Sequence, residues 1–345
     1  MSNGKSEGTV IEPGPPEVEQ GLDELMELIE EGHRFLVVAH ISPDGDAVGS
    51  TLALKAILEN QGKEVIAYNR DEVPYNLRFL PGSNDWVTEI GQQPIDGTIL
   101  LDCGTPKRIG EEFPERGWGT KTVVIDHHET YDPDFADIYI RDTEAAATGE
   151  LLYRLAQRYE DTSIEVAKNV YCCLMTDTGG FRYSNTSRTA FRMAGELVDR
   201  GVGPWEMSSE IYENEPKERL ELLSQVLQTL ALSDCQRLAF LRVTRSMVAS
   251  VGSDEDLTDG FINYARSISG VEVATQMREV GDEQWRVSFR SRGKVNVARL
   301  AEVFGGGGHH NAAGCEIAGK PAEIEEKLSE ALVELLDESY EDVDE

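Results

Sequence analysis

The chain alternates between short apolar runs and longer segments in which apolar residues recur at helical spacing. The apolar runs lie at residues 34–39, 64–68, 97–102 and 122–126, and helical spacing is found at 21–31, 47–60 and 146–159. Strands that are apolar throughout and alternate with helices are typical of a parallel sheet buried on both faces. The first part of the chain therefore predicts an α/β domain with a parallel sheet and helices on both faces.

The pattern changes near residue 230. Helical spacing continues through 164–177, 188–200 and 215–230, and strand-like runs follow at 236–244, 271–280 and 284–292. We expect a second, smaller α/β domain with a mixed sheet, and an active site in the cleft between the two domains. The predicted boundaries are a disordered tail at 1–17, a first domain at 18–214, a linker helix at 215–232, a second domain at 233–337 and an acidic tail at 338–345.

The charge of the chain is strongly negative. Of its 345 residues, 64 are acidic and 32 are basic, which gives a formal net charge of −32, and lysine is scarcer than arginine. Such a charge destabilises a compact protein unless salt screens it. The composition favours a cytoplasm of very high salt, as in a halophile, over an acidic protein from an ordinary cell. It argues against a general duplex-DNA binder, which needs a basic surface.

This interpretation predicts a strong dependence of folding on salt. Self-repulsion acts over about 30 Å at 0.01 M salt and only about 3 Å at 1 M. We expect the melting temperature to rise steadily when KCl is raised from millimolar to molar concentrations, and the chain to lose structure in dilute buffer. Circular dichroism melts across that range check the prediction, and full stability in dilute buffer would contradict it.

The cysteines and the lengths of the apolar runs indicate the cellular compartment of the protein. The five cysteines show neither the paired spacing of a zinc site nor a disulfide framework, which fits a reducing interior. The sequence has no apolar run of 18 residues and no signal-peptide pattern. It therefore predicts a cytoplasmic protein without a membrane partner.

Residues with metal-binding side chains follow four of the predicted elements. These residues are His40, Asp44 and Asp46 after the first strand, Asp102 after the third, Asp126, His127 and His128 at the end of the fourth, and Asp177 at the end of a helix. A single aspartate in such a place is more often a helix cap or a turn residue. Five of the six histidines, however, lie in three short motifs, which capping does not explain.

Carboxylates gathered this densely repel one another unless a cation lies between them. Imidazole nitrogen together with carboxylate oxygen suits Mn²⁺, with Mg²⁺, Co²⁺ or zinc as weaker alternatives. Two cations held about 3.5–4 Å apart are a common device for hydrolysing phosphate esters. The sequence thus predicts two divalent metal ions at the carboxyl edge of the sheet.

The motifs "HISPDGDAVGS", "LLDCG", "VVIDHH" and "LMTDTGGFRYSNTS" resemble those of the DHH phosphoesterase superfamily, and "VSFRSRGKVNVARLAEVFGGGGHHNAAG" resembles the DHH-associated domain. The resemblance covers about residues 20–335. It implies that the first domain is the metal-binding catalytic domain and the second a substrate-binding domain. The two-domain size resembles the short oligoribonuclease and phosphoadenosine-phosphate phosphatase branch.

The resemblance also implies a role for each motif position. His40, Asp44 and Asp102 look like ligands of the first metal, and Asp46, Asp102, His127 and Asp177 like ligands of the second. Asp102 would then bridge the metals, and a water between them would be the nucleophile. Asp126 would orient the site, and His128 would face the scissile phosphate. The resemblance thus implies that the catalytic residues are His128, Asp126 and Asp102.

The second domain carries the expected substrate contacts. Residues 305–308 are four glycines, which could form a flexible linker or could let backbone amides approach an anion. The region from Trp285 to Leu300 has five basic residues and no acidic one. The expected contacts to substrate, in part implied by the resemblance, are Arg290, Gly306, Gly307, Gly308, His309 and, from the first domain, Arg182.

The sequence therefore predicts a manganese-dependent phosphoesterase that hydrolyses short RNA or DNA oligonucleotides to nucleoside monophosphates. A second expected substrate is 3′-phosphoadenosine 5′-phosphate. The alternatives are a cyclic-di-AMP or linear di-adenylate phosphodiesterase, a RecJ-type single-strand exonuclease and a non-catalytic nucleotide sensor. By analogy with the family, we also expect the protein to form a homodimer.

Overall fold

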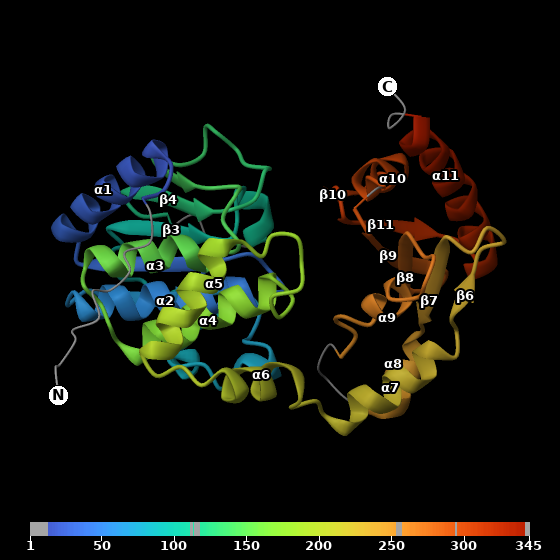
Figure 1. The fold of residues 1–345 in the computed structure, drawn as a ribbon, viewed down its shortest axis with the longest axis horizontal. Coiled ribbons are helices and arrows are strands. Elements are labelled where there is room, and N and C mark those ends of the chain that lie inside the picture. The colour runs from blue at the N-terminus through green and yellow to red at the C-terminus, as the bar shows by residue number, and fades with distance from the viewer. Residues whose placement is uncertain (1–12, 111–112, 114–117, 253–256, 294, 342–345) are drawn as a thin grey trace, which may run out of the picture. The chain divides into compact units, whose positions relative to one another are not determined.

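The computed structural model describes residues 13–110, 113, 118–252, 257–293 and 295–341. The chain divides into two compact units, Met1–Asn214 and Glu215–Glu345 (Figure 1). Each unit has its own sheet and its own apolar core. The two α/β units agree with the predicted fold class.

The first unit is built on a five-stranded sheet in which all neighbouring strands are parallel, in the order β2-β1-β3-β4-β5. The strands are β1 (Arg34–Ala39), β2 (Glu64–Tyr68), β3 (Gly97–Leu101), β4 (Lys121–Asp126) and β5 (Ile138–Arg141). The first four are the predicted apolar runs. β5 is four residues long, and half of it is only partly buried, so its sequence did not indicate a strand.

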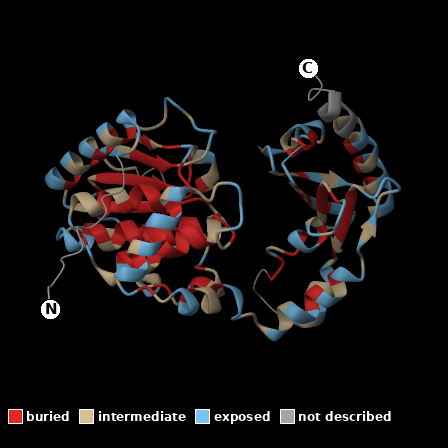
Figure 2. Cartoon of the chain, in the orientation of Figure 1, coloured by how far each residue is buried: buried red, intermediate tan, exposed pale blue. Residues whose placement is uncertain are grey.

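Four long helices cover one face of this sheet, the first three in contact with its strands and the fourth packed on the second and third, and Figure 2 shows their buried residues in red. They are α1 (Pro16–Glu31), α2 (Gly45–Asn60), α3 (Thr148–Arg158) and α4 (Ile164–Asp177). The opposite face, which carries Leu36, Leu100 and Val124, packs against loop residues and the short 3₁₀ helix η3 (Pro106–Ile109). The helical layer expected on that second face is thus formed largely by loops, because the segments after β2 and β3 are too rich in glycine and proline for long helices.

The remaining helices of this unit are α5 (Arg188–Asp199) and α6 (Pro204–Tyr212), and the short 3₁₀ turns η1 (Tyr75–Leu77) and η2 (Ser83–Asp85) lie between β2 and β3. α5 packs beside α4. Its buried positions are Ala190, Met193, Ala194 and Leu197, which recur at helical spacing. The opposite side of α5 is exposed.

The second unit contains a six-stranded mixed sheet in the order β10-β11-β9-β8-β7-β6, with β7 and β8 parallel and the other pairs antiparallel. Its strands are β6 (Ala231–Leu232), β7 (Leu238–Val243), β8 (Val273–Gly281), β9 (Gln284–Ser291), β10 (Gly307–His309) and β11 (Ala312–Ala318). Its helices are α7 (Lys217–Leu227), α8 (Arg245–Val251), α9 (Ile262–Arg266), α10 (Val297–Val303) and α11 (Pro321–Glu341).

The structure differs from the predicted boundaries at three places. α1 begins at Pro16, inside the predicted tail, because proline is well tolerated in the first turn of a helix. The predicted linker contains α7 but also strand β6, which pairs with β7. α11 continues to Glu341, past the predicted start of the acidic tail. Residues 1–12 and 342–345 of the predicted tails lie outside the described residues.

The glycine run is part of the sheet and not a flexible linker. Residues 307–309 form β10, which pairs with β11. A Cβ atom at Gly306 would lie 2.1 Å from the Gly314 carbonyl oxygen, and one at Gly308 would lie 2.5 Å from Ala313 Cα. These two glycines are therefore explained by close contact with β11, and not only by approach to a ligand. A Cβ atom at Gly307 would meet nothing within 4 Å.

Candidate metal centre

The first group of candidate ligands lies where β1 leads into α2. β1 delivers His40, which is 7% exposed, and Asp44 precedes the first turn of α2. Asp44 Oδ1 accepts hydrogen bonds from the backbone N–H groups of Asp46 and Ala47, so this aspartate caps the helix. Its Oδ1 also lies 3.9 Å from His40 Nε2. The capping interpretation and the ligand interpretation of Asp44 are thus compatible.

Asp46 is buried inside the first turn of α2. Its Oδ2 accepts a hydrogen bond from the Thr148 N–H at 2.7 Å, and its Oδ1 accepts one from the Gly149 N–H at 3.1 Å. Both donors belong to the first turn of α3, whose N-terminus favours a negative charge. The carboxylate is thereby fixed between two helices.

Asp102 follows β3 in the left-handed region, with φ 54°. Its side chain is 2% exposed. Oδ2 lies 3.3 Å from His40 Nε2, whereas Oδ1 lies 3.6 Å from His127 Nε2 and accepts a hydrogen bond from Thr148 Oγ1. The two oxygens of one carboxylate therefore face two different histidines. This is the geometry that a bridging ligand requires.

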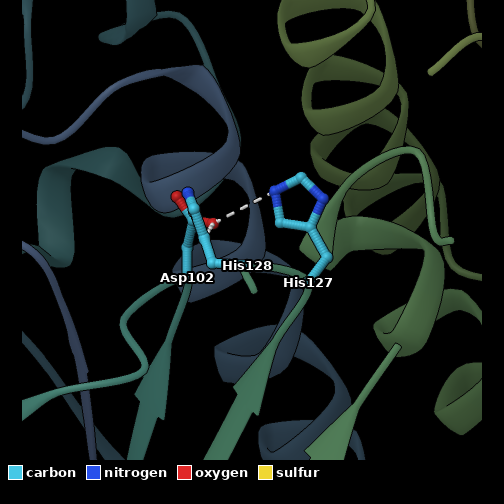
Figure 3. A group of neighbouring side chains, drawn as sticks. All are labelled: Asp102, His127 and His128. Atoms are coloured by element: carbon cyan, nitrogen blue, oxygen red, sulfur yellow. Dashed lines mark ion pairs between the residues drawn. The ribbon is translucent and has the colours of Figure 1, made fainter. Parts of the chain in front are cut away.

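The triplet Asp126-His127-His128 lies at the end of β4, next to β3, and Figure 3 shows both imidazoles beside Asp102. Asp126 is fully buried, and its Oδ1 accepts hydrogen bonds from the backbone N–H groups of His127 and His128. The same oxygen lies 2.7 Å from His128 Nδ1. Asp126 thus fixes the backbone and the ring of His128, whose Nδ1 also lies 3.3 Å from Asp102 Oδ1.

Asp177 completes the cluster at the end of α4. Its Oδ2 lies 3.6 Å from His127 Nε2. Asn185, from the loop that follows, donates to the backbone oxygen and to Oδ2 of Asp177 and also to the Ala146 carbonyl oxygen. Asn185 therefore attaches this loop to the site.

Burial and the neighbouring charges shift the pKa values of the clustered carboxyl groups. Burial, followed by the charges of Asp102 and Asp177, raises the pKa of Asp46. Burial also raises the pKa of Asp177, to which the charge of Asp102 adds. For Asp102, burial alone would raise the pKa, but the close contact of its Oδ2 with His40 Nε2 and the charges of the three histidines outweigh burial and lower the pKa. A cluster of this kind is stabilised by a bound cation.

The histidine tautomers support the same conclusion. His40 Nδ1 lies 2.8 Å from the Ile41 carbonyl oxygen, and His127 Nδ1 lies 3.1 Å from the Ala145 carbonyl oxygen. Since a carbonyl oxygen only accepts, both Nδ1 atoms carry a proton. Both Nε2 atoms then face carboxylates, and the buried His40 Nε2 has no hydrogen-bond partner among the described residues. An additional proton or a metal ion must lie between these groups.

The donor atoms fall into sets that fit a metal ion. His40, Asp44 and Asp102 form one group and Asp46, His127 and Asp177 another, and the potential ligand atoms of each group lie within 4.8 Å of one another. Asp102 also groups with His127 and His128. The structure thus brings together all eight residues that the sequence singled out at the ends of three strands and one helix, although they span more than 130 positions of the chain.

The sequence did not indicate two residues that hydrogen-bond to the cluster from other elements. Thr148 bonds both Asp46 and Asp102, yet it lies in a run of small residues without any recognisable pattern. Arg141, on the unpredicted strand β5, donates to the carbonyl oxygens of His128 and Glu129, and its guanidinium lies 4.4 Å from the centre of the Tyr131 ring. Only the pairing of Asp126 with Arg141 across β4 and β5 reveals this contact.

The predicted substrate residues lie in both units. Arg182 is exposed, five residues after Asp177, and its Nε donates to the Gly179 carbonyl oxygen. Arg290 lies on β9 and pairs with Ala312 of β11, which in turn pairs with residue 309 of β10. The side chain of His309 lies outside the described residues.

Comparisons with known proteins match both halves of the chain. Residues 34–177 match the model of the DHH family, N-terminal domain, and residues 244–341 match that of the DHHA1 domain. The bifunctional oligoribonuclease and PAP phosphatase NrnA of Thermus thermophilus is 34% identical over 285 residues, which cover 82% of this chain and 84% of the relative. The chain belongs to the DHH family. It is an enzyme of the DHH phosphoesterase type.

Two further proteins are similar to this chain over most of its length. NrnA of Bacillus subtilis is 27% identical over 85% of this chain and 92% of its own length. The crystal structure of an exopolyphosphatase-related protein from Bacteroides fragilis superposes with a TM-score of 0.84 and 30% identity, covering 95% of this chain and 98% of that one. The similarity to these two proteins thus extends over most of the chain.

None of the helices in the part of the chain that the structure describes is long and apolar enough to cross a membrane.

Proposed function

We propose that this DHH enzyme hydrolyses short oligonucleotides to nucleoside monophosphates at a centre of two divalent cations, and that it also removes a phosphate from 3′-phosphoadenosine 5′-phosphate. The observation that carries the proposal is Asp102, whose two oxygens face the histidines of two adjacent ligand groups. The NrnA relatives, named for both activities, support this choice of substrates.

In this proposal one cation is held by His40, Asp44 and Asp102, and the other by Asp46, Asp102, His127 and Asp177. A pair of cations at this position, Mn²⁺ before Mg²⁺ or Co²⁺ from the mixed imidazole and carboxylate donors, supplies an activated water and neutralises charge on the phosphate. The chain's own contribution is to fix the ligands. The carbonyl oxygens of Ile41 and Ala145 hold the Nε2 atoms of His40 and His127 toward the carboxylates.

His128 is the group assigned to the scissile phosphate. Asp126 Oδ1 accepts from its Nδ1 and so fixes the ring, and in this proposal the imidazole holds or transfers a proton near the leaving group. We further propose that Arg290 and the exposed Gly307 contact substrate phosphate in the second unit, together with Gly306, Gly308 and His309. Arg182 provides a contact from the first unit. A cytoplasmic location and a homodimer complete the proposal.

Two substitutions in the glycine run distinguish a role in packing from a role in substrate binding. Gly307→Ala meets nothing within 4 Å, so we expect its melting temperature to be unchanged, whereas Gly308→Ala clashes with β11 and should be destabilised by roughly 1–3 kcal/mol. If substrate approaches this edge, Gly307→Ala should raise KM several-fold without lowering kcat. Thermal melts and steady-state kinetics check both variants. An unchanged KM in Gly307→Ala would remove this residue from the substrate site.

The experiment that tests the function is a product time course with Mn²⁺ in molar KCl. The substrates are a 5′-labelled RNA ladder from dinucleotide to 24-mer, phosphoadenosine phosphate, cyclic-di-AMP and single-stranded DNA. Rapid loss of the shortest RNAs together with release of phosphate from phosphoadenosine phosphate is expected. A preference for cyclic-di-AMP would replace the proposal with second-messenger hydrolysis, and processive loss of long DNA would replace it with a RecJ-type exonuclease.

A further inference from the structure

The segment that leads from Asp177 into α5 differs in charge from the rest of the chain. Residues 178–195 contain Arg182, Arg188 and Arg192 and no acidic residue, in a chain with twice as many acidic as basic residues. All three arginines are exposed. This local positive charge is suited to an anionic ligand, whereas the net charge of the chain repels one.

An exposed aromatic side chain lies between two of these arginines. Arg188, Phe191, Arg192 and Gly195 are spaced at i, i+3, i+4 and i+7 on α5, so they share the face opposite its buried residues. Phe191 is 57% exposed. A phenylalanine that served only the core would be buried on the other face of the helix.

The ring of Phe191 is held in place from behind. It stacks on Phe181 with a centroid distance of 5.4 Å and an interplanar angle of 23°, and Phe181 in turn contacts Tyr171 of α4. Phe181 has φ 62°, which is rare for a bulky residue, and follows two glycines that also have positive φ. Strain of this kind is found most often at functional sites. The loop therefore fixes a rigid aromatic pair four residues after Asp177.

Gly195 is unusual on this face as well. It lies inside α5, where glycine disfavours the helix, and a Cβ atom there would meet nothing within 4 Å. Packing within the described residues thus gives no reason for a glycine. A side chain at this position would lie on the same helix face as Phe191 and Arg192, and glycine adds none there.

We propose that the face of α5 formed by Arg188, Phe191, Arg192 and Gly195 binds single-stranded nucleic acid. A base stacks on Phe191, and the two guanidinium groups contact the adjoining phosphates, which is how aromatic and basic side chains combine in sequence-independent binding of single strands. The proposal rests on the proposed function, because it assigns this face to the part of the oligonucleotide that lies beyond the nucleotide being cleaved.

Binding of fluorescein-labelled pentaadenylate RNA, measured by anisotropy in the presence of EDTA, tests the proposal without turnover. Phe191→Ala should raise Kd about tenfold, and Phe191→Tyr should restore most of the affinity because stacking is retained. Trp205→Ala, which removes an aromatic residue that is 71% exposed on α6, is the matched control. An equal Kd for Phe191→Ala and the wild-type chain would overturn the proposal.

Salt and helix stability provide two independent tests. Arg188→Gln and Arg192→Gln should each raise Kd about threefold at 0.1 M KCl and less at 2 M, whereas the effect of Phe191→Ala should persist at 2 M. Lys121→Gln is the control for the loss of one positive charge, because Lys121 begins β4, at the end of that strand opposite to Asp126. Gly195→Gln should raise the melting temperature and yet weaken binding several-fold, which unfolding cannot explain. Tighter or unchanged binding in Gly195→Gln would argue against this face.

The two proposals fail in different ways. Turnover of the same RNA by the wild-type chain with Mn²⁺ is measured in parallel. If the RNA binds through α5 but is not cleaved, the proposed function is wrong and the binding surface stands. If it is cleaved and Phe191→Ala behaves like Trp205→Ala, the surface is wrong. A change of molar mass in light scattering on Phe191→Ala, without any change in Kd, would show instead that this face joins two copies of the chain.

Discussion

Replacing Asp102 with alanine is expected to lower kcat by about 1,000-fold or more, which corresponds to about 4 kcal/mol of transition-state stabilisation. Among the described residues, Asp102 is the carboxylate that presents one oxygen to His40 and the other to His127, so its loss disturbs both cations at once. Removal of Asp44, which is largely exposed and belongs to one group, should cost less. Steady-state hydrolysis of short RNA with Mn²⁺ measures the effect.

Calorimetric titration with Mn²⁺ separates the loss of metal from other causes. The Asp102→Ala chain should show weaker binding at both sites, whereas Asp199→Ala, which removes an exposed carboxylate at the end of α5, should behave as the wild type. Full manganese-dependent activity in Asp102→Ala would refute the two-cation assignment. Normal binding of two Mn²⁺ ions without activity would assign Asp102 a role other than bridging.

Asp126→Ala is expected to have the second-largest effect, a fall in kcat of about 100-fold with metal affinity largely retained. Asp126 Oδ1 accepts from His128 Nδ1 and from two backbone N–H groups, so the substitution leaves three donors without this acceptor and releases the ring of His128. Asp126→Asn retains an acceptor oxygen and loses only the charge. We expect its kcat to fall only about tenfold.

Two measurements distinguish the positioning of His128 from a general loss of stability. The ¹⁵N shifts of the His128 ring should show a single tautomer in the wild-type chain and a mixture in Asp126→Ala. If Asp126 acts through His128, the double variant with His128→Ala should be no slower than His128→Ala alone. Additive losses would mean that Asp126 acts independently of His128.

The sequence by itself determined the fold class and identified the polar residues that follow the strands. Parallel strands that are buried on both faces must be apolar throughout, so four of the five strands of the first sheet were visible as runs. The polar residues that end those runs must lie at one edge of the sheet, because parallel strands have their carboxyl ends together. His40, Asp44, Asp46, Asp102 and His127 were therefore predictable as a cluster, whereas Asp177 ends helix α4 and was placed with them by the family resemblance.

The tertiary structure decided how that cluster is held. Thr148 and Arg141 reach the site from α3 and from β5, and neither contact leaves a periodic signal, because a single hydrogen bond from a distant segment has no counterpart in local spacing. The glycine run is similar. Its composition was compatible with a linker or a ligand loop, and only the pairing of β10 with β11 showed that Gly306 and Gly308 are needed for close packing. Sequence patterns record burial and periodicity, whereas contacts between remote segments exist only in the folded chain.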